Sequence, residues 1–146
     1  MKKKVFATIL VFVQFGALFG LVFRTSIEWD FNWSTAFIVL SFIIGLSALY
    51  TMKKSKFTIS PIPRDQSLLV EDGLYGYIRH PMYLAVLLLA LGFVWQKPDE
   101  INIIIYCILT LDLLMKLHWE EKLLAEKFEG YKTYQQRTKK LIPFVY

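Results

Sequence analysis

Four apolar blocks separated by short polar segments make up most of the chain. They cover Val5 to Phe23, about Thr35 to Met52, Met82 to Trp95, and Ile101 to about Trp119. A hydrocarbon core about 30 Å thick needs roughly 20 helical residues to cross it, and the third block reaches that length only if residues before Pro81 continue it. The pattern predicts an all-α, multi-pass membrane protein with four transmembrane helices.

The polar residues divide the chain into two parts. Residues 1–52 form a two-span hairpin whose first span is interrupted by few polar side chains, such as Gln14, and we interpret this part as a packing scaffold. Residues 53–146 contain nearly all the polar information. They comprise a cytoplasmic interfacial loop with two prolines in residues 61–63, spans three and four, and a C-terminal amphipathic helix from Glu120 to about Lys140.

Composition and charge support the membrane interpretation and add an orientation. Hydrophobic residues make up 55% of the 146, and the formal net charge is +5. Cytoplasmic loops carry the excess of lysine and arginine, and with a cytoplasmic N-terminus only Arg24 and Lys97 fall on the outer side. We therefore expect both termini to be cytoplasmic, in the cytoplasmic (inner) membrane. The excess charge then reflects topology and attraction to anionic membrane lipids, and no nucleic acid is expected as a partner.

Metal and disulfide chemistry are not expected. The chain has a single cysteine, Cys107, and two histidines, His80 and His118, which do not form a helical His-x-x-x-His pair. Structural and catalytic metal sites need more ligands at closer spacing than this.

Spans three and four are predicted to be antiparallel neighbours because only residues 96–100 connect them. Counting equal numbers of residues back from this turn puts Pro81 at about the depth of Lys116, and Tyr77 near Glu120. The segment around Pro81 is therefore expected to face the cytoplasmic end of span four.

The cytoplasmic half of span four carries three charged residues on one helical face. Asp112, Lys116 and Glu120 are spaced four and four, which stacks them along that face. Ionisable groups at membrane depth are costly and indicate function by default. The alternative is that Asp112 and Lys116 only neutralise each other while Lys116 reaches toward the interface.

Two separated motifs around this hairpin carry a family resemblance. The chain resembles the isoprenylcysteine carboxyl methyltransferases and their prokaryotic relatives and, more distantly, the phospholipid N-methyltransferases. The resemblance covers residues 67–144 and rests on Gly73-Leu74-Tyr75, Arg79-His80-Pro81-Met82-Tyr83, Glu120-Glu121, Leu124, Phe128, Tyr131, Tyr134 and Ile142-Pro143-Phe144.

The resemblance implies an enzyme that moves a methyl group from S-adenosylmethionine to a lipophilic acceptor, a prenylated thiol compound or a lipid head group. Catalytic roles pass to Lys116, as an acceptor contact, and to Glu120. Cofactor contacts pass to Leu69, Val70, Tyr75, Arg79, His80, Pro81, Met82, Tyr83 and Glu120. Tyr131 and Tyr134 fit either cofactor contacts or aromatic anchors at the membrane interface.

The residue chemistry agrees with this implication. Arg79 or His80 can bind the carboxylate of the cofactor, Glu120 can accept hydrogen bonds from ribose hydroxyls or the amino group, and aromatic faces suit a nearby cation. Methyl transfer depends on positioning and desolvation, so no catalytic triad is required. An amine acceptor would call for a base such as Glu120 or Asp112.

Two other functions fit the sequence less well. One is a non-enzymatic small membrane protein whose charged hairpin mediates helix assembly, and it predicts no binding of S-adenosylmethionine. The other is a membrane reductase using a nicotinamide cofactor, which would need a larger helical body and a dinucleotide site, while the chain has no glycine-rich fingerprint after a strand.

Overall fold

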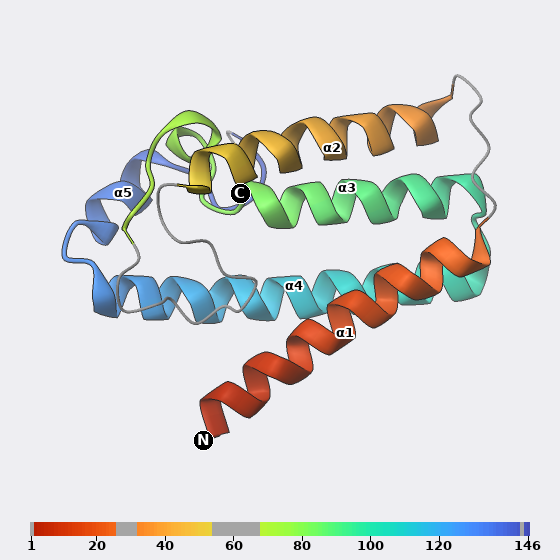
Figure 1. Cartoon of the computed structure of the whole chain (residues 1–146), viewed down its shortest axis with the longest axis horizontal. Helices are drawn as coiled ribbons and strands as arrows, with labels where there is room; N and C mark the ends of the chain where they lie inside the picture. Colours follow the sequence, from red (N-terminus) through yellow and green to blue (C-terminus); the bar gives the residue numbers. More distant parts are fainter. Residues whose placement is uncertain (1, 26–31, 54–67, 144) are drawn as a thin grey trace.

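The computed structural model describes residues 2–25, 32–53, 68–143 and 145–146, and these form an all-helical protein (Figure 1). The loop predicted around residues 61–63 lies outside the described residues. The described elements are α1 (Lys2–Arg24), α2 (Trp33–Met52), the 3₁₀ turn η2 (Gly73–Gly76), α3 (Pro81–Gln96), α4 (Glu100–Lys127) and α5 (Tyr131–Arg137).

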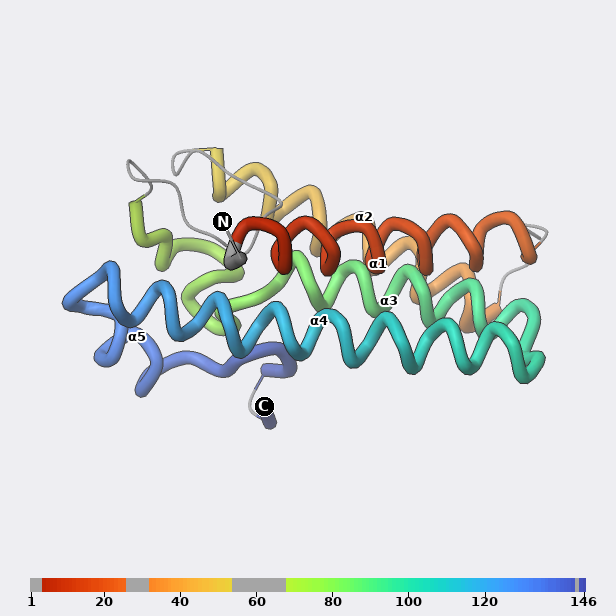
Figure 2. The backbone as a smooth tube through the Cα atoms, turned by 90° about the horizontal axis from the view of Figure 1, so that it is seen from below, coloured from red at the N-terminus to blue at the C-terminus, as the bar shows by residue number. Residues whose placement is uncertain are grey.

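The four long helices form a bundle in which α3 is the central element. Helices α2, α3 and α4 run side by side, and α1 crosses α4 at an angle (Figure 1). The main packing pairs are α2 on α3 and α1 on α4, and the view turned by 90° shows α1 and α2 on the same side of α3 and α4 (Figure 2). Helices α1 and α2 therefore cover one side of α3 and α4, which belong to the predicted methyltransferase-like part.

Three helices, α1, α2 and α4, are long and apolar enough to cross a membrane. Helix α3 is apolar but has only 16 residues, or about 24 Å at 1.5 Å per residue. The prediction of four full-length spans is therefore not confirmed. Residues before Pro81 do not extend α3, because proline occupies the first helical turn, where its missing N–H is tolerated, and the preceding residues turn away as η2.

The outer surface of the bundle is strongly apolar. Large side chains point outward from α1, α2 and α4. Among them are Phe12, Phe19, Leu46, Tyr50 and Leu111, each at least 62% exposed. Exposed apolar surface on this scale is unfavourable in water and is typical of contact with lipid. The buried core joins the two parts of the chain, since Leu21 of α1 packs with Ala90 of α3 and Leu113 of α4.

Close contact between α2 and α3 depends on Gly92. Ser34 Oγ donates a hydrogen bond to the Gly92 carbonyl oxygen over 2.9 Å. A Cβ atom at Gly92 would lie 2.6 Å from Ile38 Cγ1 and 3.1 Å from the Ser34 carbonyl oxygen. No side chain fits there without displacing α2.

A polar cluster fastens the end of α1 to the turn between α3 and α4. Arg24 donates from Nε to Asn102 Oδ1 at 2.9 Å and from Nη2 to Asp99 Oδ2 at 3.1 Å. Asp99 also caps α4 by accepting from the Asn102 backbone N–H. This hydrogen bond and the neighbouring Arg24 guanidinium lower the pKa of Asp99.

The C-terminal region differs from the single helix predicted from Glu120 to about Lys140. Helix α4 ends at Lys127, Phe128 is extended, and α5 begins after Gly130. The prediction of a continuous helix is wrong, and an amphipathic membrane-surface helix is not confirmed. After α5 the chain becomes extended and pairs with the segment before α3 through a parallel bridge between Ile78 and Lys139.

Candidate functional site

The segment that precedes α3 is held by the C-terminal tail. Arg79 N–H donates to the Lys139 carbonyl oxygen at 2.8 Å, His80 N–H donates to that of Lys140 at 3.0 Å, and Lys139 N–H donates to that of Tyr77 at 3.0 Å. The backbone N–H groups of Arg79 and His80 are therefore both satisfied within the protein. These hydrogen bonds to the tail fix the backbone position of His80.

Arg79 is buried in a network that joins three elements. Its Nε donates to Glu121 Oε1 of α4 at 2.5 Å, and its Nη1 donates to the carbonyl oxygens of Thr138 at 2.6 Å and Gln135 at 3.2 Å. The Arg79 side chain is 6% exposed and that of Glu121 is 9% exposed. Most of the guanidinium is thus engaged within the protein, which suits a role in holding α4, α5 and the tail together.

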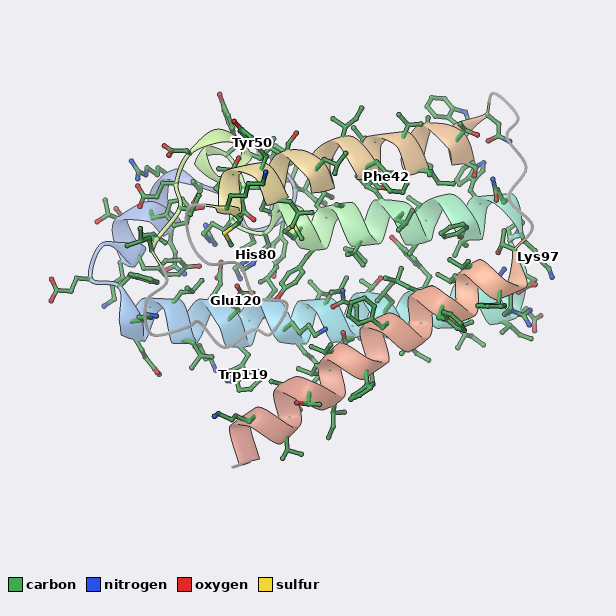
Figure 3. All side chains as sticks on the ribbon, in the orientation of Figure 1. Phe42, Tyr50, His80, Lys97, Trp119 and Glu120 are labelled. Atoms are coloured by element: carbon green, nitrogen blue, oxygen red, sulfur yellow. The ribbon has the colours of Figure 1, made fainter. Side chains whose placement is uncertain are left out.

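His80, Tyr83 and Glu120 form a second cluster directly beside Arg79. Tyr83 OH donates to Glu120 Oε2 at 2.6 Å, and His80 Nδ1 lies 3.8 Å from the same oxygen. The His80 and Tyr83 rings are stacked, with centroids 5.3 Å apart. Figure 3 shows His80 near the start of α3 and Glu120 below it on α4. The Glu120 side chain remains 23% exposed, so the carboxylate can still accept hydrogen bonds from a ligand.

The pairing of α3 with α4 is confirmed, with an offset of about one turn. Counting residues from the connecting turn predicted Tyr77 beside Glu120, whereas Glu120 contacts His80 and Tyr83. Side chains lean toward the N-terminus of their own helix, and α3 and α4 start at opposite ends of the bundle. Tyr83 therefore leans toward the start of α3 and Glu120 leans away from the end of α4, so the two side chains meet.

Tyr75 in η2 is the aromatic wall next to this cluster. Its backbone carbonyl oxygen accepts from Tyr134 OH at 2.6 Å, and Tyr134 and Tyr131 are buried. These two tyrosines are therefore packing residues, and their rings are not exposed as aromatic anchors at an interface would be. Burial and the nearby Glu120 carboxylate raise the pKa of Tyr75, so its hydroxyl stays protonated at neutral pH. Gly73 permits the turn because its φ is +57°, a value that favours glycine.

A cavity of about 340 Å³ opens beside these residues, within the size range of small-molecule sites. Its lining combines a polar end with apolar walls and comes from η2, the segment before α3, and all four long helices. The lining residues are Gln14, Phe15, Leu18, Leu49, Met52, Tyr75, Arg79, His80, Met82, Tyr83, Val86 and Glu120.

Lys116 lies behind the cavity wall. Its Nζ donates to Gln14 Oε1 at 2.6 Å and lies 3.3 Å from Asp112 Oδ2. The Lys116 side chain is completely buried and does not reach toward the interface. The pair with Asp112 is present as the spacing predicted, and the contact with Gln14 ties α1 to α4.

Comparison with known proteins identifies the region that holds these residues. Residues 34–126 match the sequence model of the isoprenylcysteine carboxyl methyltransferase family. The chain belongs to this family. It is also 28% identical over 120 residues to Protein-S-isoprenylcysteine O-methyltransferase B of Arabidopsis thaliana, an alignment that covers 80% of this chain and 61% of the relative. The chain thus spans less than two thirds of the length of that curated relative.

The predicted cofactor residues of this methyltransferase-family chain separate into two groups. Those that line the cavity are Tyr75, Arg79, His80, Met82, Tyr83 and Glu120. Leu69 and Val70 are half-buried and Pro81 is buried, and none of the three is among the lining residues. Lys116, predicted to be catalytic, is not among the lining residues. It is hydrogen-bonded to Gln14, which lines the cavity.

The sequence interpretation did not assign any site residue to α1 or α2. The structure adds Gln14, Phe15 and Leu18 from α1 and Leu49 and Met52 from α2 to the cavity wall. The part interpreted as a scaffold therefore also shapes the site. In the sequence, Gln14 was the one indication that α1 contributes to the site, because a glutamine inside an apolar span needs a buried hydrogen-bonding partner.

Proposed function

We propose that this protein is an integral membrane methyltransferase that uses S-adenosylmethionine to methylate a lipophilic acceptor at the cytoplasmic membrane interface. The observation that carries the proposal is the two-ended cavity. His80, Tyr75 and Glu120 form its polar end, while Leu18 and Val86 belong to its apolar walls. Such a cavity suits two ligands of different polarity that meet inside one site.

The residues at the polar end suit S-adenosylmethionine. Tyr75 OH is buried and has no hydrogen-bond partner within the described part of the chain, a condition that a ligand with carboxylate, amino and hydroxyl groups relieves. His80 Nε2 lies 3.4 Å from Glu121 Oε1, which holds the imidazole ring beside the cavity. Glu120 offers carboxylate oxygens for amino or hydroxyl groups. Met82 and Tyr83 provide a polarisable, aromatic wall for a sulfonium cation.

S-adenosylmethionine, when bound, supplies a methyl group on a positively charged sulfonium. The acceptor donates a lone pair to the methyl carbon while the carbon–sulfur bond breaks, and the electron pair stays on sulfur. A carboxylate acceptor therefore needs no base, whereas an amine would pass a proton to Glu120. The protein contributes by aligning the reactants and excluding water from the cavity.

The arrangement of the helix ends supports an orientation with both termini in the cytoplasm. The start of α1, the end of α2, the start of α3 and α5 all lie at one end of the bundle (Figure 1). Most lysines and arginines belong to this end, whereas Arg24 and Lys97 lie at the other. The cavity then sits at the cytoplasmic side, open to a soluble cofactor, while α1 and α2 border a face toward the lipid. In a bacterial cell this would be the inner membrane.

Calorimetric titration of detergent-purified protein with S-adenosylhomocysteine tests the proposal. We expect saturable binding that weakens about tenfold or more in His80→Ala and in Glu120→Ala, because each variant removes a hydrogen-bonding group from the polar end. His118→Ala and Glu126→Ala are matched controls, since both residues are exposed on α4, and they should bind like the wild type. Folded wild-type protein that does not bind contradicts the proposed function, and unchanged affinity in both site variants contradicts the site.

A further inference from the structure

Gln14 is held in one orientation within the cavity wall. The residue is 7% exposed and lies outside the region matched to the family. Its Oε1 accepts the hydrogen bond from Lys116 Nζ. A lysine ammonium carries only donors, so it can pair with the amide oxygen but not with the amide nitrogen. Lys116 therefore fixes the Gln14 amide with its Nε2 directed away from Lys116.

Because Oε1 of Gln14 is bonded to Lys116, the amide Nε2 is the group of this side chain that can bind a ligand. Among the residues that the structure describes, none accepts a hydrogen bond from it, and Gln14 is part of the cavity lining. The amide nitrogen therefore has donors available to a ligand in the cavity. An oxygen atom supplied from the cavity would satisfy it.

Asp112 in turn fixes Lys116. Asp112 Oδ2 lies 3.3 Å from Lys116 Nζ, and the side chains are 3% and 0% exposed. Lys116 does not line the cavity, so its effect on a ligand passes through Gln14. This separates its role from the direct acceptor contact that the sequence indicated.

Gln14 also lies at a different depth from the polar cluster of Glu120 and His80. Lys116 and Glu120 are one helical turn apart on α4, about 6 Å along the axis. Gln14, bonded to Lys116, is therefore one turn deeper than the cluster of Glu120 with His80. The same cavity is lined by Leu18 and Val86, apolar side chains suited to a lipid tail.

We propose that Gln14 is a specificity-determining residue whose amide Nε2, oriented by Lys116, donates a hydrogen bond to an oxygen of the acceptor head group. Lys116 and Asp112 are positioning residues in this arrangement. The inference rests on the proposed function and deepens it. It predicts that the cavity prefers a head group with an accepting oxygen over an ammonium group on the same tail.

The test compares two probes that share a farnesyl tail. N-acetyl-S-farnesylcysteine carries a carboxylate and farnesylamine carries an ammonium group. Each is titrated by calorimetry into detergent-purified protein saturated with S-adenosylhomocysteine. Gln14→Glu replaces Nε2 by oxygen while its carboxylate still accepts from Lys116. We expect the affinity for the carboxylate probe to fall about 10- to 100-fold, with S-adenosylhomocysteine affinity unchanged. Gln136→Glu makes the same chemical change at an exposed position of α5 and should have no effect.

A second variant removes the donor without adding charge. Gln14→Met should weaken binding of the carboxylate probe about tenfold and leave the amine probe unaffected. Unchanged carboxylate affinity in both Gln14 variants overturns the inference, as does a wild type with no preference between the probes. Wild-type protein that fails to bind S-adenosylhomocysteine overturns the proposed function instead, so the two failures are distinguishable.

The positioning role of Lys116 has its own readout. Lys116→Met is combined with Asp112→Asn so that no unpaired carboxylate stays buried. The preference for the carboxylate probe should fall as in Gln14→Met, and adding Gln14→Met should lower it no further, because all three changes remove one contact. Additive losses would contradict a role through Gln14.

Discussion

Arg79 supports the site through hydrogen bonds within the protein, which leave little of its guanidinium for a ligand. Its hydrogen bonds reach Glu121 on α4 and the Thr138 carbonyl oxygen in the tail. The tail in turn holds the His80 backbone. Loss of Arg79 would leave the buried Glu121 carboxylate without its arginine partner, and it would release the tail that sets the backbone position of His80.

Arg79→Ala is therefore expected to destabilise the protein by about 3–5 kcal/mol, the usual cost of removing one partner from a buried ion pair. Arg79→Lys keeps the charge but cannot reach three acceptors in fixed directions, so we expect an intermediate loss. Thermal unfolding in detergent measures both. Arg137→Ala is the control, since Arg137 pairs with Glu71 at an exposed position and should cost less than about 1 kcal/mol. Equal losses at the two arginines would contradict this account.

At the residue scale, local motifs predicted part of the site. His80, Met82, Tyr83 and Glu120 were indicated by sequence alone, and they line one cavity. Arg79 was assigned a cofactor contact because its partners, 42 and 59 residues away, were not apparent from spacing. Gln14 was missed for a related reason. Its partner Lys116 is 102 residues distant, and the rotation of α1 against α4 has no local signature.

At the scale of elements, the contact of α2 with α3 sets the position of the whole site. Helix α3 begins at Pro81, directly after His80, so any shift of α3 moves His80 and the cavity lining beside it. The contact has no free space at Gly92, where an added Cβ would lie 2.6 Å from Ile38 Cγ1 of α2.

Gly92→Ala should destabilise the protein by about 1–3 kcal/mol, because the added methyl overpacks the contact with Ile38. Gly16→Ala is a matched control within α1, where nothing lies within 4 Å of the added Cβ. The higher helix propensity of alanine should leave that variant unchanged or slightly more stable. Thermal unfolding of the two variants in one detergent provides the comparison, and a Gly92→Ala variant as stable as Gly16→Ala would show that the contact is loose.

The Asp99 cluster at the turn between α3 and α4 predicts that the stability of the fold depends on pH. The pKa of Asp99 is lowered by the Asn102 backbone N–H and by Arg24. A carboxyl group with a depressed folded-state pKa stabilises the fold above its unfolded pKa, near 3.9, and this contribution is lost as the pH falls through the folded-state pKa.

Asp99→Asn keeps a capping oxygen but removes the charge. At pH 7 the variant should unfold at a lower temperature than the wild type, and the difference should shrink as the pH is lowered below about 4. Unfolding temperatures recorded by circular dichroism over this range would decide the point. A difference that stays constant at all pH values would mean that the charge of Asp99 contributes nothing.

Element boundaries show where sequence reasoning succeeded and where it failed. The apolar blocks predicted the bounds of α1, α2 and α3 and the start of α4 closely, because composition determines which segments are stable as apolar helices, whereas α4 continues beyond its block to Lys127. The continuous C-terminal helix was wrong because the extended pairing of Lys139 with the segment before α3 is a tertiary contact. Such contacts override local helix propensity.

At the scale of the whole molecule, the bundle brings together a polar cluster and apolar walls in one cavity. The matched family region supplies η2, α3 and most of α4, while α1 completes the cavity from outside that region. The central claim is that this combined cavity transfers a methyl group to a lipophilic acceptor.

The most direct measurement of this claim uses purified protein in liposomes that contain N-acetyl-S-farnesylcysteine or a lipid extract of the native membrane. Methyl-tritiated S-adenosylmethionine is added and the label in the organic phase is counted. We predict label above a protein-free control for the wild type and a strong loss in Glu120→Ala. Absence of label with folded wild-type protein, or equal label in Glu120→Ala, would contradict the account.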